Sequence, residues 1–485
     1  MKFPLTQDLT PEVMNSFWSI FNQLSIGLGL VFTLLVLSRR KGSPATTWSW
    51  ILSFFLLPIF GPLLYSLVGY SDFKRRKRPK PEPQRKLPET GFLMRSTLGE
   101  LEPRFLPVSQ LAENLSGFPP MGGNRLQFFE GQETIYQALS QAIEGAKKSI
   151  FLEYYIFRPD AVGVHFRDLL IQKAQQGLEV KILVDQVGSF SLNTKFLQPL
   201  LDAGAQVAFF GALTLKRPWG FQLRNHRKLA LIDGVQAFTG SQNICSDFRA
   251  WRLLKLDWID NQVLIEGPSV SQLATVFCED WEFTTGHKVK SVEDALIANS
   301  QVGQSVVQFL PTGPDEPSHA FEKILMALIH AAQHRITLLS PYFIPTESIA
   351  ISLEAAVRRG VQVEILVPRK SDLWLVDAAS KSWYWNLLQG GVSIWETTES
   401  FIHAKQVTID SEVAMIGSAN MDERSFRLNF ECTTLVFGKS EVVSLEQMFS
   451  QRRNHAEAIL LSHFKDQAFL VRVKQGLFRL IAPLL

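Results

Sequence analysis

The chain has 485 residues, which is too long for a single hydrophobic core and suits a small number of domains. Its net charge of +3 is too small for the chain as a whole to bind nucleic acid electrostatically, so we expect no nucleic-acid partner. The three cysteines, Cys245, Cys278 and Cys432, share no CxxC spacing, which disfavours a disulfide framework or a structural zinc site.

The N-terminal region contains two long uncharged stretches. Residues 17–37 form an apolar run of 21 residues, enough to cross the hydrocarbon core of a membrane as a helix. The second stretch, residues 42–71, is interrupted by Pro58, Gly61 and Pro62, so a kinked helix and a re-entrant helix are both alternatives for it. A cleaved signal peptide is disfavoured, because the first run is too long and no small-residue cleavage site follows. We expect residues 1–73 to be a membrane anchor that forms a transmembrane helical hairpin.

A basic run follows the second stretch, at residues 74–80 (KRRKRPK). Positive residues beside a membrane span favour the cytoplasmic side and attract anionic lipid. We therefore expect residues 74–120 to be a basic linker and interfacial segment, and the catalytic part to lie on the cytoplasmic side. The turn at residues 39–41 (RRK) opposes this topology, since it would face outside if both stretches span the membrane.

The rest of the chain repeats one unit, with the first copy at residues 121–300 and the second at residues 301–485. In the first copy we expect helix, strand, helix and strand at residues 133–147, 149–157, 163–176 and 179–185. The second copy repeats this order at residues 320–333, 336–342, 347–359 and 362–367. Apolar strands that alternate with amphipathic helices predict α/β layers around a largely buried sheet.

Both copies carry the same polar signature. In each, a lysine follows a histidine at position +2, an aspartate at +7, a serine at +15 and an asparagine at +17. One HxK match is weak, but two copies that share five positions are a strong signal. The signature residues are His226, Lys228, Asp233, Ser241 and Asn243 in the first copy, and His403, Lys405, Asp410, Ser418 and Asn420 in the second.

These residue types suit chemistry on a phosphodiester. Apolar alternation after each HxK predicts a strand, in which histidine and lysine share a face. Two halves that face each other would form a cationic pocket in which the serines and asparagines also bind the phosphate. One histidine can attack phosphorus while the other protonates the leaving oxygen and later deprotonates the acceptor. The lysines supply fixed positive charge, so we expect no metal and no cofactor.

Carboxylates near the signatures have two expected parts. A nucleophilic histidine needs a partner that fixes its tautomer, and Asp260 and Glu431 are candidates for supporting carboxylates. Asp233 and Asp410 lie at an odd offset from their histidines and should point away from them. We therefore expect a structural part for these two, in pairing with backbone or arginine.

The two signatures resemble those of the phospholipase D superfamily, whose fold is a pair of α/β/α halves with one active site between them. The chain is also similar, over nearly its whole length, to the bacterial cardiolipin synthases of this superfamily. The similarity lies in residues 153–157 (EYYIF), 224–228 (RNHRK), 340–345 (SPYFIP) and 420–431 (NMDERSFRLNFE). At residues 258–260 (WID) the family more often has Trp-Arg-Asp, so this chain lacks a positive charge near the site, a departure that bears on the lipid preference.

The resemblance implies two repeats packed face to face behind the membrane anchor, in a multi-pass protein of the bacterial inner membrane. It implies transfer of a phosphatidyl group between two phosphatidylglycerol molecules, through a phosphatidyl-histidine, to give cardiolipin and glycerol. It places both HxK-Asp signatures in the catalytic machinery, with His226 as nucleophile and His403 as general acid/base. A membrane phospholipase D, a phosphatidylserine synthase, a nuclease and a scaffold with a decayed site remain alternatives, and the oligomeric state is open.

Overall fold

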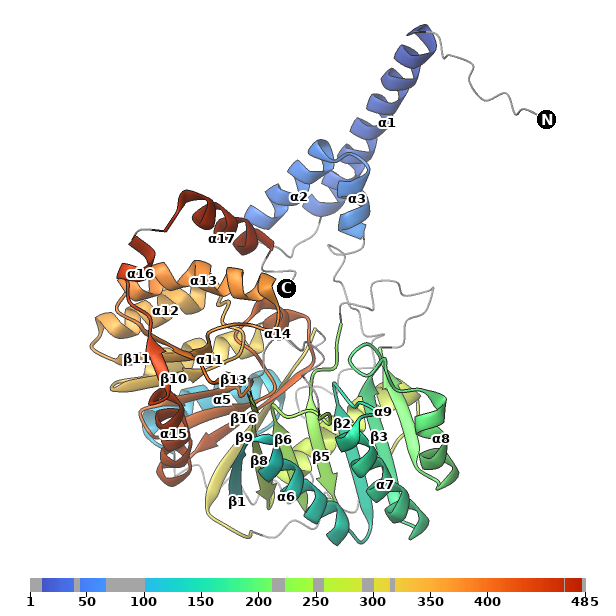
Figure 1. Cartoon of the computed structure of the whole chain (residues 1–485), viewed down its shortest axis with the longest axis vertical. Helices are drawn as coiled ribbons and strands as arrows, with labels where there is room; N and C mark the ends of the chain where they lie inside the picture. Colours follow the sequence, from blue (N-terminus) through green and yellow to red (C-terminus); the bar gives the residue numbers. More distant parts are fainter. Residues whose placement is uncertain are drawn as a thin grey trace, which may run out of the picture. The chain divides into compact units, whose positions relative to one another are not determined.

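The computed structural model of the chain describes residues 11–38, 44–66, 101–211, 223–246, 257–289, 301–314, 319–465 and 467–481. These residues form two compact units (Figure 1). The N-terminal unit contains the first three helices, and the repeat unit contains everything described from residue 101 onward. The basic residues at 39–41 and 74–80 lie outside the described part of the chain.

The N-terminal unit consists of α1 (Pro11–Leu37), α2 (Pro44–Leu56) and α3 (Phe60–Leu64). Among the described residues, α1 is the one helix long and apolar enough to cross a membrane, over the 20 residues Trp18–Leu37. The second uncharged stretch breaks at Pro58, between α2 and α3, as the sequence suggested. Because α2 has 13 residues and α3 has 5, neither spans a bilayer alone, and the transmembrane hairpin stays a prediction.

The first half of the repeat unit alternates strands with helices, as predicted. Its elements are β1 (Met121–Glu130), α6 (Gln132–Gly145), β2 (Ser149–Tyr154), α7 (Ala161–Gln175), β3 (Glu179–Asp185), α8 (Thr194–Asp202), β4 (Gln206–Phe210), β5 (Lys228–Ile232), β6 (Gln236–Gly240), β7 (Asp257–Ile259), β8 (Asn261–Glu266) and α9 (Val270–Thr285). Strands β2, β3 and β4 are parallel, while β5 runs antiparallel to β2.

The second half repeats this order. Its elements are β9 (Ser305–Thr312), α11 (Ala320–Ala331), β10 (Arg335–Leu339), α12 (Glu347–Arg358), β11 (Gln362–Pro368), α13 (Trp374–Gln389), β12 (Ser393–Thr397), β13 (Ser400–Ile402), β14 (Gln406–Ile409), β15 (Val413–Gly417), α14 (Glu423–Arg427), β16 (Glu431–Phe437), α15 (Lys439–Arg453), β17 (Ala456–Ala458), α16 (Ser462–Lys465) and α17 (Phe469–Ile481). The predicted strand at 336–342 ends early, at Leu339, because Pro341 has no N–H for a ladder.

The two halves join edge to edge, not face to face as expected. Strands β1 and β9 pair antiparallel, so all the strands except β7 and β13 belong to one 15-stranded sheet. This pairing covers a strand edge of each half, which would otherwise leave backbone groups unpaired. Strands β7 and β13, one from each half, form a separate parallel pair. The preceding η3 (Pro103–Phe105) and α5 (Leu106–Ser116) pack on β9 and α11.

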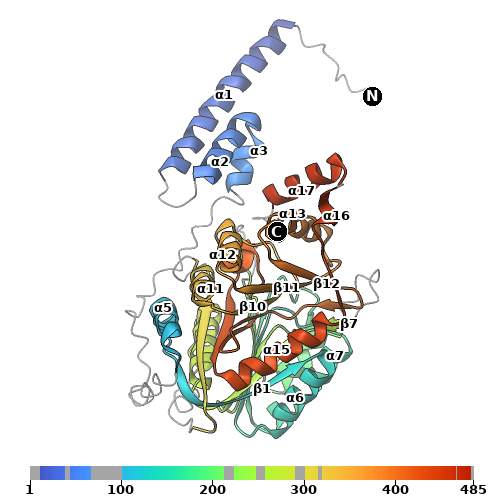
Figure 2. The ribbon, with the colours of Figure 1, turned by 90° about the vertical axis from the view of Figure 1, so that its left-hand side faces the viewer.

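Helices cover both faces of the sheet. In the second half, Leu338 lies in the core beneath α11 and α12, while the next residue, Leu339, packs with Phe449 of α15. Successive strand residues point to opposite faces, so α15 covers the face opposite α11 and α12 (Figure 2). In the first half, Phe151 of β2 stacks on Phe277 of α9, while the next residue, Leu152, lies in the core beneath α7, so both halves are α/β/α layers, as the sequence predicts.

Candidate active site

The two HxK segments lie at the entrance of equivalent strands. Strand β5 begins at Lys228 and β14 begins one residue after Lys405, so both histidines precede the strands in which we expected them. The chain is diverted there because each histidine N–H pairs with the other half. The N–H of His226 donates to the carbonyl of Phe430 at 2.9 Å, and that of His403 donates to Ile259 at 2.8 Å.

Each predicted carboxylate holds the histidine of the opposite half. Glu431 of the second half lies 3.0 Å from Nδ1 of His226 through either of its oxygens. Asp260 of the first half lies 2.6 Å from Nδ1 of His403. A carboxylate accepts only, so Nδ1 carries the hydrogen and Nε2 keeps its lone pair for chemistry. The exchange makes one site out of two halves.

The signature serines lie behind the histidines. The hydroxyl of Ser241 donates to Asp260 at 2.5 Å, and that of Ser418 donates to Glu431 at 2.5 Å. In this structure both hydroxyl groups thus orient the supporting carboxylates. Binding of substrate phosphate by these serines stays a prediction.

A glycine before each serine permits the close approach of two strands. A Cβ at Gly240 would lie 2.4 Å from the carbonyl oxygen of Asn261, and one at Gly417 would lie 2.3 Å from that of Cys432. No other residue fits such a distance to backbone. The Gly-Ser pair therefore brings the serine beside the carboxylate that it orients.

The signature lysines are buried beside the histidines. Lys228 donates from Nζ to the carbonyl of His226 at 2.7 Å, and Lys405 donates to that of His403. Burial lowers the pKa of Lys228 to about 8 and that of Lys405 to about 7, although Glu431 and Asp260 oppose the shift. Near neutral pH the two lysines are therefore only partly protonated, and the positive charge of the site changes with pH.

The histidines are held in the neutral form. Burial lowers the pKa of His226 to about 4, against the opposing effect of Glu431. Burial and the neighbouring Lys405 likewise lower the pKa of His403 to about 4, against Asp260. A neutral imidazole with a free Nε2 is a competent nucleophile.

The asparagines differ between the copies. The side-chain oxygen of Asn243 accepts from the N–H of Ile156 at 3.1 Å, which fixes the loop after β2. The side-chain oxygen of Asn420 is buried and has no hydrogen-bond partner among the described residues. Phosphate binding by either asparagine stays a prediction.

The signature aspartates lie at the other ends of β5 and β14, away from the histidines. Asp233 accepts from the N–H groups of residues 147–149, and Asp410 accepts from those of residues 333–335. Asp410 also pairs with Arg104 at 2.6 Å. These contacts with backbone and arginine are of the structural kind, and nothing in them brings either carboxylate to the reacting groups.

Sequence reasoning assigned no part to two rings that flank the histidines, those of Tyr155 and Trp258. The ring of Tyr155 lies 4.8 Å from that of His226, and the ring of Trp258 lies 5.1 Å from that of His403. The ring of Phe401 is tilted against that of Trp258, with the ring centroids 4.3 Å apart. Tyr155 lies within the predicted strand at 149–157 and directly follows β2, and Trp258 lies two residues before Asp260, so proximity to the motifs was the available signal.

A buried ionic network beneath His226 was also missed. Arg227 pairs with Asp280 of α9 and donates from Nε to the carbonyl of Glu431 at 3.1 Å. Nearby, Asn225 donates to Glu153 at 2.6 Å. Burial and the neighbouring Asp280 raise the pKa of Glu153 well above its usual range. The second copy has Ala404 where the first has Arg227, so this network has no counterpart beside His403.

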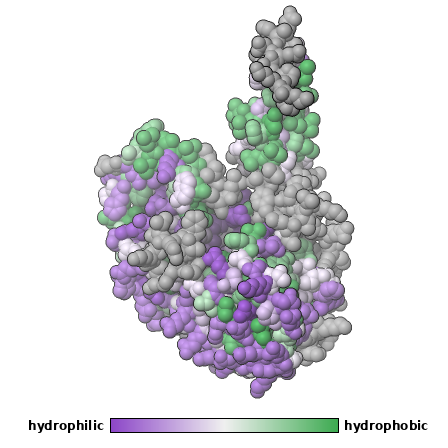
Figure 3. All heavy atoms as spheres, turned by 45° about the vertical axis from the view of Figure 1, so that its right-hand side comes forward, coloured by the Kyte–Doolittle hydropathy of each residue, from purple (hydrophilic) through white to green (hydrophobic). Residues whose placement is uncertain are grey.

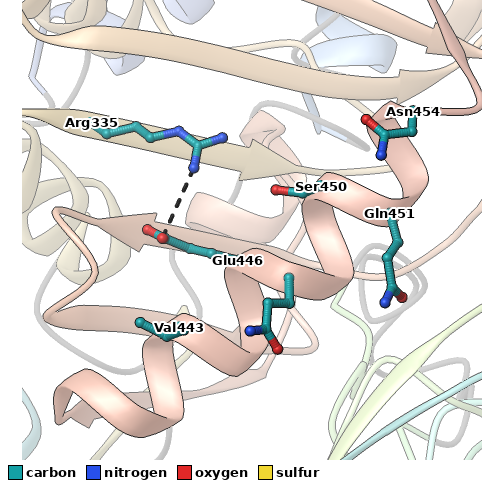
Figure 4. A pocket seen from close by; sticks show the side chains of 7 residues that line it. Arg335, Val443, Glu446, Ser450, Gln451 and Asn454 are labelled. Atoms are coloured by element: carbon teal, nitrogen blue, oxygen red, sulfur yellow. Dashed lines mark ion pairs between the residues drawn. The ribbon is translucent and has the colours of Figure 1, made fainter.

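A pocket of about 350 Å³ lies away from this site, between α15 and the start of β10 (Figure 4). Arg335 faces Glu446 across it at 3.9 Å. Arg335 opens β10, whereas the HxK segment lies beyond the other end of that strand. Within the described residues, no cluster of histidine, cysteine or carboxylate side chains is arranged to hold a metal ion.

The fold and the site define a two-half protein of the phospholipase D type. Residues 139–281 and 325–453 match the family described as "Cardiolipin synthase, PLD-like domain", and residues 28–69 match "Phospholipase_D-nuclease N-terminal". A crystal structure of phosphatidylserine synthase from Haemophilus influenzae has the same fold, with a TM-score of 0.58 over 79% of this chain and 100% of its own, at 14% identity.

Curated relatives give the particular family. A cardiolipin synthase from Geobacillus kaustophilus is 32% identical and covers 97% of this chain and 96% of its own length. Cardiolipin synthase 1 from Bacillus cereus is 32% identical, covering 94% of this chain and 92% of its own length. The chain belongs to the cardiolipin synthase family of the phospholipase D superfamily.

Proposed function

We propose that this chain is a cardiolipin synthase, which transfers a phosphatidyl group from one phosphatidylglycerol to the hydroxyl group of another and releases glycerol. The observation that carries the proposal is the pair of histidines, His226 partly buried and His403 buried, each held at Nδ1 by a carboxylate of the other half and flanked by a buried lysine. This arrangement presents two imidazoles and two ammonium groups to one anionic phosphodiester.

The residues divide the reaction into two displacements. Nε2 of His226 attacks phosphorus. His403 takes up a proton at Nε2 when the anionic phosphodiester enters the site, and it donates this proton to the glycerol oxygen as the bond from phosphorus to that oxygen breaks. His403 then removes the proton from the glycerol hydroxyl of a second phosphatidylglycerol, whose oxygen displaces His226. One phosphodiester is broken and one is made, so no activated donor is needed. Lys228 and Lys405 offset the charge on the transferring group.

The surroundings of the two carboxylates support this choice of nucleophile. Glu431 accepts from His226, Ser418, Ser425 and Asn429, which spread its charge. Asp260 accepts from His403 and Ser241, and its other oxygen has no partner among the described residues. The less neutralised carboxylate favours an imidazolium more strongly. His403 is therefore better suited to hold a proton, and His226 to attack as the neutral base.

The remaining parts of the chain fit a membrane enzyme. We assign residues 1–73 to an anchor that crosses the membrane twice, and residues 121–300 and 301–485 to the two halves. Residues 74–120 are a basic linker and interfacial segment, whose last part, η3 and α5, packs on the second half. The apolar length of α1 supports the first crossing. The substrates and the product, phosphatidylglycerol and cardiolipin, reside in the bilayer of a bacterial inner membrane, and the halves would face the cytoplasm.

The test is a product analysis with purified full-length protein and labelled phosphatidylglycerol as the sole lipid. Cardiolipin and glycerol should appear in equal amounts, without a cytidine nucleotide, and added glycerol should reverse the reaction. Phosphatidic acid as the main product would make the chain a phospholipase D. Product that forms only with a cytidine-diphosphate lipid donor would replace the proposal with a phosphatidylserine synthase or another liponucleotide-dependent enzyme.

A further inference from the structure

The last helix of the chain, α17, turns an apolar face away from the protein. Phe478 packs its ring against Trp374 of α13 at 5.1 Å, and Arg479 lies 3.9 Å over the ring of Trp383. Phe469, Leu470 and Leu477 are instead exposed by 69%, 77% and 58%. At the helical repeat these three residues share one stripe about 100° wide, and the centre of this stripe lies about 120° from Phe478.

The charges of α17 complement an anionic surface. Its sequence FLVRVKQGLFRLI contains Arg472, Lys474 and Arg479 and no acidic residue. On the helical wheel, Lys474 lies on one flank of the apolar stripe, and Arg472 and Arg479 lie on the other. Apolar side chains flanked by basic residues are typical of a helix that lies in the interface of an anionic bilayer.

Two loops, one that carries Phe190 and one that leads to Trp374 at the start of α13, place further exposed rings at the edge of the sheet where the active site lies. Phe190, exposed by 77%, follows β3, whose last residue Asp185 accepts from the N–H of Asn225 next to His226. Trp374, exposed by 63%, follows β11, which is parallel to β10. The last residue of β10 pairs with Gln406, just beyond Lys405. Both loops therefore leave the sheet on the side of the histidines.

We propose that these residues form an apolar rim, made of Phe190, Trp374, Phe469, Leu470 and Leu477, which inserts into an anionic phospholipid bilayer and holds the active-site edge of the repeat unit on the membrane. Figure 3 shows apolar surface gathered at the α17 end of this unit, whereas the opposite end is mostly hydrophilic. The inference rests on the proposed function for its purpose, since a site for bilayer lipids must face the bilayer. Its geometry does not depend on turnover.

A second copy of the chain is a less suitable occupant of the rim. Basic residues flank the apolar stripe of α17 on both sides, and two such helices brought together would set Arg472, Lys474 and Arg479 near their own counterparts. Like charges at that distance oppose association, whereas the phosphate groups of an anionic lipid neutralise them. The occupant we propose is therefore the lipid surface, and self-association is an outcome of the test.

The test places an environment-sensitive fluorophore on the full-length protein. Leu470→Cys is labelled in a Cys278→Ser background, in which Cys245 and Cys432 are buried. Val235→Cys is the matched control, because this apolar residue is exposed by 46% and lies in the turn after β5, at the edge away from His226. Each protein is placed in nanodiscs, one chain per disc, of phosphatidylcholine with or without phosphatidylglycerol.

The label at position 470 should shift to the blue and be quenched several-fold more than the label at 235 by a quencher carried on the lipid acyl chains. The effect should be larger in discs that contain phosphatidylglycerol. Equal quenching at the two positions would overturn the proposal. A blue shift of the label at position 470 without quenching by the lipid-borne quencher would also overturn it, because protein would then cover the rim. Equal quenching of the label at position 470 in discs with and without phosphatidylglycerol would contradict the proposed role of the basic residues in binding anionic lipid.

A second measurement separates this proposal from the proposed function. Leu470→Glu with Leu477→Glu should lower turnover of phosphatidylglycerol in vesicles several-fold and leave turnover of a short-chain, water-soluble phosphatidylglycerol unchanged. Equal loss on both substrates would contradict a docking role. If the label inserts into the bilayer but the protein makes no cardiolipin, the membrane-binding role of the rim is supported and the proposed synthase activity is refuted.

Discussion

The surroundings of His226 and His403 differ, although the two signatures have the same spacing. His226 lies beside Tyr155 and above the ionic network of Arg227, while His403 lies beside a pair of aromatic rings, with Trp258 at 5.1 Å and Phe401 at 6.5 Å. The shared spacing supplies the reacting groups twice. The differences place the two imidazoles in unequal surroundings, so equal spacing in the sequence does not require equal roles in the reaction.

The largest effects on activity should come from replacing each histidine in turn, which tests whether the two have different roles. His226→Ala removes the atom that forms the covalent bond, so cardiolipin formation should fall by about 10⁴-fold or more. His403→Ala removes the acid/base group and should cost about 10²–10⁴-fold. His165→Ala, on the surface of α7, is the control and should leave activity unchanged. Equal residual activity in both variants would contradict the division of roles.

The two lysines should differ in their effect on the pH dependence of activity. Their ammonium groups are charged below their pKa values of about 7 for Lys405 and about 8 for Lys228, so kcat/KM should fall as the pH rises through this range. The anionic substrate stabilises the charge, so the same limb in kcat should lie at higher pH. Lys405→Arg keeps its charge throughout and should lose the lower part of the limb. An unaltered profile in this variant would mean that another group titrates.

The network of Arg227 and Asp280, which lies beside His226 and has no counterpart beside His403, can be tested by measuring the free energy of unfolding. Arg227→Ala leaves Asp280 buried without its cation and should cost about 3–5 kcal/mol in the free energy of unfolding. Arg125→Ala breaks an exposed pair with Glu266, with the arginine side chain 61% exposed, and should cost less than about 1 kcal/mol. Thermal unfolding in detergent compares the two. Midpoints lowered by the same amount would show that the network contributes no more than a surface pair.

Metal removal should have the smallest effect. If Lys228 and Lys405 supply the positive charge at phosphorus, exhaustive chelation should leave cardiolipin formation nearly unchanged. The assay should use detergent-solubilised substrate, because anionic bilayers respond to cations themselves. Activity that is lost on chelation and restored by one divalent ion would overturn the charge assignment.

The repeat made most of the fold and the site's components predictable. Periodicity located the helices and strands within a few residues, and fixed spacing picked out both HxK segments. The α/β/α layering followed from buried strands that alternate with amphipathic helices. The signature aspartates were expected to point away because of their odd offset, and they bind backbone at the far ends of β5 and β14.

What the sequence could not supply was the pairing between distant segments. Glu431 lies 205 positions from His226, and no local pattern states that each half lends its carboxylate to the other. The edge-to-edge joining of β1 and β9 is likewise a choice among strand edges that periodicity leaves equal. Because the HxK segments pair with the opposite half, the histidines precede the strands in which alternation had placed them.

The central claim is that His226 becomes the phosphatidyl carrier while His403 moves the proton. The most direct measurement is to incubate the His403→Ala protein with labelled phosphatidylglycerol, quench at alkaline pH and map the modified peptide by mass spectrometry. The account predicts a phosphatidyl adduct on His226, because breakdown of the intermediate lacks its base. An adduct on His403, found in the matching His226→Ala experiment, would reverse the roles and contradict the account.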